Sequence, residues 1–236
     1  MNLLLLREAD FREDGTVRLT GRRLAHAREV LRAAAGGKVR VGRLGGLVGT
    51  AEVLRLDDSG LVLRPELTEA PPPRPGVDLV LAIPRPKALR RILPAAASLG
   101  VDRIVLVNAA RVEKSYFDSG VLEPASMEEL LVLGLEQARD TTLPQVLVRD
   151  RFRPFVEDEL DALWPQTTRL VAHPGAASPP ERTDQRLVLG IGPDGGWVQF
   201  ELDLLQAHGF KVFGLGQRTL RVEVAVPYAL GALRKQ

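Results

Sequence analysis

Hydrophobic residues follow two different patterns along the chain, and the first of them ends near residue 70. Up to that point, short runs of apolar and β-branched residues alternate with turns that contain glycine. The candidate strands are Thr16–Thr20, Lys38–Leu44, Leu47–Leu56 and Gly60–Arg64. Short strands at this spacing predict a small β-barrel.

A helical pattern interrupts these strands from about Arg22 to Ala34, and the pair Gly36-Gly37 ends it. One apolar face recurs at helical spacing, formed by Leu24, Ala27, Val30 and Leu31. Arginines surround that face. The pattern predicts one amphipathic helix against the barrel.

The segment Ala70–Gly76 reads APPPRPG, with four prolines in five positions. Prolines lack a backbone donor and favour a stiff, extended connector. We therefore predict two domains, residues 1–70 and 77–236, joined by a linker at 71–76.

After the linker, apolar runs typical of buried strands alternate with helical patterns. The strands expected are Val77–Ile83, Arg103–Asn108, Gln145–Val148, Arg169–Ala172, Arg186–Ile191 and Lys211–Leu215. The helices expected are Pro86–Leu99, Met127–Thr141, Phe155–Leu163, Gln199–His208 and Val224–Lys235. This alternation predicts an α/β domain with a mostly parallel sheet covered on both faces.

Composition narrows the chemistry. The 236 residues include no cysteine, which excludes disulfide scaffolds and thiolate zinc sites, and the three histidines have no metal-ligand spacing. No metal is expected. The apolar run Leu3–Leu6 is far too short to cross a bilayer or to form a signal peptide, so no membrane association and a cytoplasmic location are expected.

Charge adds a weaker indication. The net charge is only +2, yet 27 of the 32 basic residues are arginine, the side chain best suited to bidentate phosphate contacts. Residues 1–75 carry 13 basic and 10 acidic side chains, a net of +3. A GC-rich genome or adaptation to heat explains the arginines equally well.

The segment Gly190–Gly196, reading GIGPDGG, lies between an apolar strand and a helix. It matches G-x-G-x-x-G formally, but no carboxylate ends the next strand and no Gly-Lys-Ser/Thr follows. Two further loops, Leu170–Pro174 and Leu215–Glu223, follow strands of the same sheet. Together the three loops predict a pocket lined by main-chain groups at the carboxyl edge.

Several motifs in order resemble one family, the ribosomal RNA small subunit methyltransferase E family. Gly192–Gly196 with Glu201 is similar to its G-P-E-G-G…E motif, and Leu215–Ala225 to L-G-x-R-x-L-R-x-E-T-A. The likeness spans nearly the whole chain. The other matching segments are His26–Arg32, Leu99–Val101, Glu113–Ser115, Glu136–Arg139 with Pro144, and His173-Pro174.

The resemblance implies methylation of N3 of a uridine in 16S rRNA by S-adenosylmethionine, on free rRNA or the 30S subunit. It also implies a SPOUT α/β domain with a deep trefoil knot, an N-terminal PUA-like RNA-binding barrel and a homodimer. The cofactor would contact Leu170, Ala172, His173, Gly190, Ile191, Gly192, Pro193, Gly195, Gly196, Leu215, Gly216, Thr219, Leu220 and Arg221.

For the chemistry we expect Arg221 to stabilise developing negative charge. Glu223 or Glu136 would accept the proton or orient that arginine, and Arg139 and Arg111 would clamp phosphate or base. RNA contacts are expected from Arg22, Arg23, Arg28 and Arg32, and from Arg85, Lys87, Arg90 and Arg91 beyond the linker.

The chain departs from the family pattern at five positions. Asp194 replaces Glu, Lys114 replaces Arg, Val224 replaces Thr, and Ala95 and Ser98 stand where Lys and Glu are common. These departures keep a non-catalytic RNA-binding or ribosome-assembly factor on the same scaffold as an alternative. A nicotinamide-dependent oxidoreductase is the other alternative, and only the formal G-x-G-x-x-G match supports it.

Overall fold

The computed structural model describes residues 3–177 and 182–233. Its contacts form two compact units, one of Met1–Pro73 with Leu131–Leu143 and one of Arg74–Leu130 with Pro144–Gln236. The segment Leu131–Leu143 thus packs with the first unit, whereas the sequence pattern places it in the second domain. The domain bounds given above stay a prediction.

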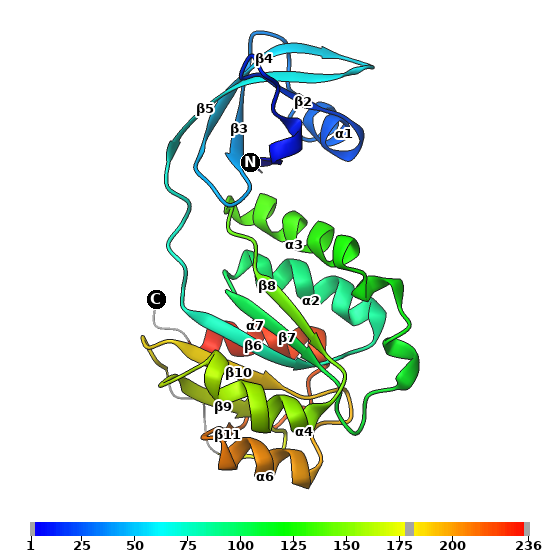
Figure 1. Ribbon diagram of the computed structural model, residues 1–236, viewed down its shortest axis with the longest axis vertical. Coiled ribbons are helices and arrows are strands. Elements are labelled where there is room, and N and C mark those ends of the chain that lie inside the picture. The colour runs from blue at the N-terminus through cyan, green and yellow to red at the C-terminus, as the bar shows by residue number, and fades with distance from the viewer. Residues whose placement is uncertain (1–2, 178–181, 234–236) are drawn as a thin grey trace. The chain divides into compact units, whose positions relative to one another are not determined.

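The first unit contains a curled five-stranded sheet in the order β1-β3-β4-β5-β2 (Figure 1). Its strands are β1 (Leu4–Leu6), β2 (Val17–Leu19), β3 (Lys38–Arg43), β4 (Val48–Asp57) and β5 (Gly60–Glu69). The β1–β3 pair is parallel and the other pairs are antiparallel. Two register shifts in the long β4–β5 ribbon, at Val48/Gly49 and Val53/Arg55, bend it over its own core.

Strand β1 was not predicted, because four consecutive leucines show no alternation. All three of its residues are buried, and their pairing with β3 explains the unbroken apolar run. Leu4 and Leu6 belong to the core of this unit, together with residues of every other strand of the sheet.

The helix of this unit, α1, spans Gly21–Glu29, so the expected extension to Ala34 is wrong. Val30 is 59% exposed, and the backbone then makes wide turns in which Leu31 N donates to His26 O and Ala33 N to Ala27 O. Leu31 and Ala33 still pack against the core. The apolar spacing therefore reflects burial in a turn and not one helical face.

Helix α3 (Pro124–Ala138) contributes its second half to the first unit. There Leu3 N donates to Glu136 O at 3.0 Å. The buried Glu136 carboxylate is 2.8 Å from Arg22 Nη1. Glu136 thus anchors the segment at Leu3.

The turn after α3 also contacts β3. An added Cβ on Gly42 would lie 2.5 Å from the Thr141 methyl, so Thr141 occupies the space of a side chain at this position.

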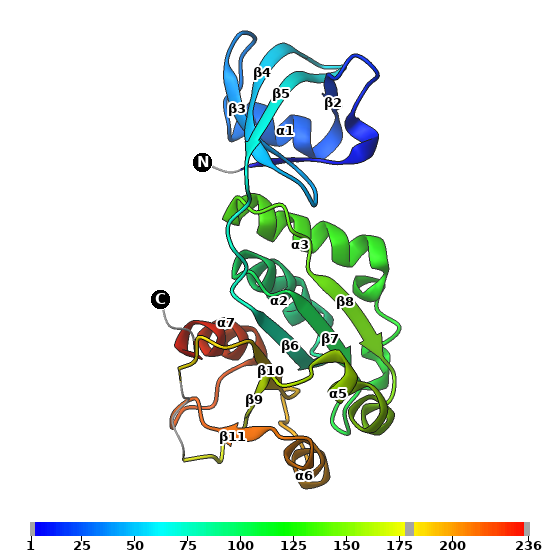
Figure 2. The same cartoon turned by 60° about the vertical axis from the view of Figure 1, so that its left-hand side comes forward.

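The second unit is built on a six-stranded sheet in the order β11-β9-β10-β6-β7-β8 (Figure 2). Its strands are β6 (Val77–Ala82), β7 (Arg103–Val107), β8 (Gln145–Arg149), β9 (Thr168–Ala172), β10 (Leu187–Ile191) and β11 (Lys211–Phe213). Every pair is parallel, which confirms the predicted parallel sheet.

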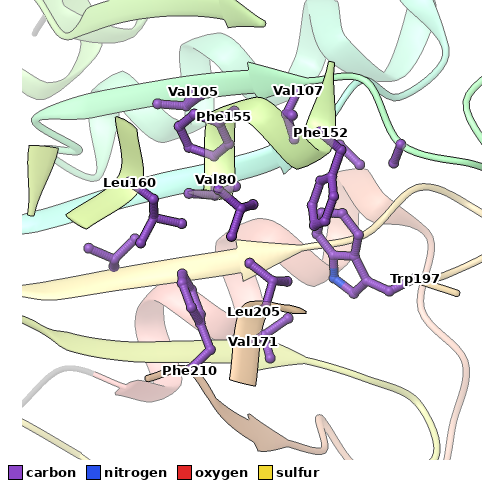
Figure 3. Packing of buried hydrophobic residues seen from close by; sticks show 14 of the residues in the cluster. Val80, Val105, Val107, Phe152, Phe155, Leu160, Val171, Trp197, Leu205 and Phe210 are labelled. Carbon is purple, nitrogen blue, oxygen red and sulfur yellow. The ribbon is translucent and has the colours of Figure 1, made fainter. Parts of the chain in front are cut away.

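Helices cover both faces of this sheet, as predicted. On one face lie α4 (Phe152–Pro154), the π-helical turn η4 (Phe155–Glu159), α5 (Leu160–Leu163) and α6 (Gln199–Ala207); on the other lie α2 (Pro86–Ser98) and α7 (Val222–Leu233) (Figure 1). The first face packs aromatic side chains such as Phe155 and Trp197 on Val80 and Val107 (Figure 3). All six residues of β6 are buried, since this strand is covered from both sides.

Helix bounds differ from expectation at several ends. The helix expected over Phe155–Leu163 begins three residues earlier, at Phe152, and α7 begins at Val222. Strand β11 stops at Phe213, so the segment 214–221 is a loop. The expected end of the last helix, at Lys235, lies outside the described residues.

Glu201, in the first turn of α6, is a buried carboxylate that holds two chain segments together. Its side chain accepts hydrogen bonds from Val198 N at 2.9 Å, which caps the helix start, and from Ala110 N at 2.7 Å, in the loop after β7. A negative charge at a helix N-terminus also complements the helix dipole. Glu201 therefore fixes α6 against the end of the neighbouring strand.

A second buried carboxylate, Asp78, lies near the amino end of β6. It accepts hydrogen bonds from Trp164 Nε1 at 2.7 Å and Arg186 Nη2 at 2.8 Å. Burial raises the pKa of Asp78 above its usual value, and the opposite effect of the Arg186 guanidinium, which lowers the pKa, is smaller.

In the described part of the chain, no helix combines the length and apolar character needed to cross a membrane.

We predict that replacing Asp78 with Asn changes how stability depends on pH. Because the pKa of Asp78 is raised on folding, its contribution to stability is complete below the usual carboxyl pKa and is lost as pH rises through the folded value. The free energy of unfolding of Asp78→Asn, measured by urea denaturation, should therefore rise relative to wild type from about pH 3 to pH 7. Asp58→Asn, at an exposed carboxylate, is the control, and a difference independent of pH would contradict the prediction.

We predict that Glu201→Ala destabilises the fold, because it leaves two backbone N–H groups without their acceptor. Each such donor costs about 1–3 kcal/mol when buried. Denaturant unfolding should show the loss, and Glu201→Gln, which keeps one carbonyl acceptor, should lose less. Equal stability of the Ala variant and wild type would show that water replaces both bonds.

Candidate functional site

The carboxyl ends of the parallel strands meet at one edge of the sheet, and a pocket opens there. Three loops line it: the one after β9, the one after β10, and the one between β11 and α7. The lining residues are Ala172, His173, Pro174, Ile191, Gly192, Pro193, Asp194, Gly196, Leu215, Gly216, Arg218, Thr219, Leu220, Val222 and Ala225. The predicted meeting of three loops is therefore present in the structure.

Glycines give the pocket its backbone walls. A Cβ on Gly192 would lie 3.0 Å from Trp197 N, so this position tolerates no side chain without a shift. Gly196 and Gly216 have φ angles of +71° and +104°, which favour glycine. Main-chain N–H and C=O groups can consequently approach a ligand without intervening side chains.

The glycine-rich loop also has an outer side. Asp194 accepts a hydrogen bond from Arg85 Nε at 2.9 Å, and Arg111 Nη1 donates to the carbonyl of Gly195. An added Cβ on Gly195 would stand 3.0 Å from Arg111 Cδ, so a side chain there would push the arginine slightly away from the loop. A second depression lies on this side.

Ten of the fourteen expected cofactor residues line the first pocket. The other four, Leu170, Gly190, Gly195 and Arg221, are not among its lining residues. Gly190 lies in β10, where a Cβ would be 3.2 Å from the Val171 side chain, so its role is packing. Five lining residues were missed, namely Pro174, Asp194, Arg218, Val222 and Ala225. These five residues lie in or directly after the three predicted loops, so their position in the sequence could have identified them.

The expected catalytic residues are spread over two regions. Arg221 is exposed directly before α7, between the lining residues Leu220 and Val222. Glu223, in the first turn of α7, faces α2, where Arg91 Nη1 lies 3.8 Å from its carboxylate. Glu136 and Arg139 belong to the first unit. The structure therefore places only Arg221 beside the pocket.

The expected RNA-binding arginines of the first unit differ in their surroundings. Arg23 is largely buried and pairs with Asp10, which indicates a structural role. Arg22 and Arg28 pair with Glu136 and Asp58 but keep 49% and 37% of their side chains exposed. The remaining five residues expected to contact RNA are exposed, namely Arg32 in the first unit and Arg85, Lys87, Arg90 and Arg91 in the second.

Comparison with known proteins identifies related sequences. A family model described as an RNA methyltransferase domain matches residues 71–234. The ribosomal RNA small subunit methyltransferase E of Treponema pallidum is 34% identical over 215 residues, covering 86% of this chain and 79% of the relative. The enzyme of that name from Synechocystis is 26% identical, covering 93% and 73% of the two chains.

A solved structure shares the fold. The ribosomal RNA small subunit methyltransferase E of Neisseria gonorrhoeae, crystallised with S-adenosylmethionine, superposes with a TM-score of 0.77 at 23% identity, covering 98% of this chain and 96% of that one. The family model covers most of the chain, and the relative from Treponema pallidum aligns along both units. This chain therefore belongs to the ribosomal RNA small subunit methyltransferase E family.

Proposed function

We propose that this protein transfers the methyl group of S-adenosylmethionine to N3 of a uridine in 16S rRNA of the small ribosomal subunit. The observation that carries the proposal is the pocket of three loops at the carboxyl edge of the sheet, in a chain of this family. A small-ribosomal-subunit substrate implies that the protein works in the cytoplasm.

The pocket fits a nucleoside methyl donor by its chemistry. Ile191, Leu215 and Leu220 supply apolar walls suited to a purine ring, while Gly192 and Gly196 expose backbone groups suited to polar atoms. When bound, the donor supplies an electrophilic methyl on a sulfonium.

Methylation at N3 requires the imide proton to leave, and the resulting negative charge spreads over the two uracil oxygens. A cation fixed beside the reacting ring stabilises that charge. We assign this role to Arg221, which lies exposed between two lining residues. Its backbone carbonyl accepts hydrogen bonds from Val224 N and Ala225 N, so the start of α7 holds the residue in place.

The proposal includes the fold type of each unit. The first unit would be a PUA-like RNA-binding barrel that presents Arg22, Arg28 and Arg32 to phosphates. The second unit would be a SPOUT domain in which the segment from β11 to α7 is threaded as a trefoil knot. Contact between Thr183 N and Leu233 O supports this, because it places the end of α7 against the connection between β9 and β10.

A homodimer would cover apolar side chains that the single chain leaves exposed. Leu99, Val224 and Tyr228 are 38%, 48% and 53% exposed, and they lie on or directly after the packed helices α2 and α7. Val224 stands where Thr is usual in the family, and a valine at this position suits a buried interface better than an exposed one.

We predict that the purified protein, given S-adenosylmethionine, incorporates methyl groups into 16S rRNA as 3-methyluridine. Free 16S rRNA and 30S subunits are tested in parallel, and digestion with mass spectrometry identifies the modified nucleoside. A different methylated nucleoside would overturn the assignment to N3. RNA binding without methyl transfer to either substrate would favour the assembly factor instead.

We predict that Arg221→Ala lowers kcat for methyl transfer by about 100- to 1,000-fold, the usual loss on removing one charge-stabilising group. Binding of S-adenosylmethionine, measured by calorimetry, should change much less, because the backbone of this loop is unaltered. Arg153→Ala, at an arginine of the same unit that is 65% exposed and has no expected role in RNA binding, is the matched control. Normal turnover in folded Arg221→Ala would remove Arg221 from the mechanism.

A further inference from the structure

The depression on the outer side of the glycine-rich loop lies directly beside the methyl-donor pocket. Pro193 and Asp194 line both, so this short stretch of chain is the wall between them. The outer depression is lined by charged and aromatic side chains, namely Arg85, Arg111, Glu113 and Tyr116. A group bound at the edge of this wall would lie beside the donor, as direct methyl transfer requires.

The polar groups of this wall alternate in a defined order. The carboxylate of Asp194 is a hydrogen-bond acceptor, and the guanidinium of Arg85 contacts it at 2.9 Å. Arg111 is held at the next residue by the carbonyl of Gly195. Because a guanidinium carries five N–H donors, each arginine can bind a second acceptor while keeping its protein contact. The wall thus presents the Asp194 carboxylate with one arginine donor beside it and a second arginine at the neighbouring residue.

Uracil has the complementary order on one edge: the O2 acceptor, the N3–H donor and the O4 acceptor. Cytosine lacks the N3 proton and carries an amino donor at C4, so it would place a lone pair against the carboxylate. A carboxylate paired with an arginine therefore discriminates between the two pyrimidines by the cost of unpaired polar groups.

An aromatic side chain completes the depression. Tyr116 is half-buried, and burial followed by the charge and hydrogen bond of Glu113 raises the pKa of its hydroxyl above the usual value. Its ring accordingly stays neutral at physiological pH. A neutral aromatic face is the usual platform for an unstacked base.

We propose that the depression formed by Arg85, Arg111, Tyr116 and Asp194 is the pocket for the target uracil, with Asp194 as the acceptor of the N3 proton. This inference rests on the proposed function and deepens it. It also gives Asp194, where the family usually has Glu, a direct part in the reaction.

The chemistry balances with these residues. The N3 proton and the incoming methyl group occupy the same in-plane position on the ring, so the proton leaves first, to the Asp194 carboxylate and then to solvent. Arg85 and Arg111 donate hydrogen bonds to O2 and O4, while Arg221, beside the donor pocket, keeps the charge-stabilising role assigned to it above. The N3 lone pair then forms the bond to the methyl carbon, while the sulfur–methyl bond breaks and its electron pair stays on sulfur.

Direct binding tests the pocket without turnover. Protein saturated with S-adenosylhomocysteine is titrated with uridine 5′-monophosphate or cytidine 5′-monophosphate and followed by NMR. Wild type should bind the uridine nucleotide at least 10-fold more tightly, and Arg111→Gln and Tyr116→Leu should lose that preference, whereas Tyr116→Phe should keep it. Equal binding of the two nucleotides would show a phosphate site only and would overturn the proposal.

Turnover tests the same residues. Arg111→Gln should lower kcat/KM for RNA methylation by about 10- to 100-fold, which is the usual discrimination carried by one base contact, with unchanged affinity for S-adenosylmethionine because Arg111 does not line the donor pocket. The matched control is Arg153→Gln, an arginine of the same unit that is 65% exposed. Arg111→Gln with the turnover of the control would overturn the proposal.

Asp194 is tested by a conservative pair. Asp194→Glu should retain methyl transfer, and Asp194→Asn should lose it. The pH dependence of kcat is measured for the wild type and both variants, because loss of a proton acceptor changes the pH profile, whereas loss of a contact alone lowers kcat equally at every pH. Identification of the nucleoside that the wild type makes distinguishes failure of the uracil pocket from failure of the proposed function. If wild type makes it but the variants all behave normally, only this pocket is wrong; if it makes another nucleoside, the proposed function itself is wrong.

Discussion

The six strands of the larger sheet all run in the same direction, and the position of every functional group follows from that constraint. Parallel strands bring their carboxyl ends to one edge, so the segments after β6, β7, β9, β10 and β11 lie along the same edge although they are up to about 130 residues apart in the chain. The central strand β6 is buried on both faces. Its apolar contacts with helices on either side keep the edge rigid enough to hold loops without regular structure.

The glycine-rich loop after β10 serves two surfaces at once. On one side its backbone lines the pocket of the three loops at Gly192 and Gly196; on the other it supports Arg111 at Gly195 and Arg85 at Asp194. The glycines serve different physical purposes: close approach to Trp197 at Gly192, and a positive φ at Gly196. A motif of this kind is therefore not explained by one ligand, and its departure at Asp194 affects both sides of the wall.

Buried carboxylates in this protein are mainly structural. Glu201 binds two backbone N–H groups, Asp78 is held by Trp164 and Arg186, and Glu136 pairs with Arg22 beside the first strand. A buried charge is stable only with such partners. This is why Glu136, expected to accept a proton, lies in an anchoring role in the first unit, while the carboxylate at the pocket wall is the partly exposed Asp194. The catalytic role expected for Glu136 stays a prediction.

Local sequence determined the features that depend on neighbours in the chain. The alternation of apolar runs and helical patterns was enough for the parallel sheet and its helices, and glycine spacing was enough to locate the three pocket loops. Features that depend on distant contacts were not readable: β1 shows no alternation because its pairing with β3 buries it entirely, and α1 ends early because Leu31 and Ala33 reach the core through wide turns. Only the tertiary structure decided which arginines line the depression beside Asp194, since Arg85, Arg111 and Asp194 come from three strand ends whose proximity is fixed by strand order and not by sequence spacing.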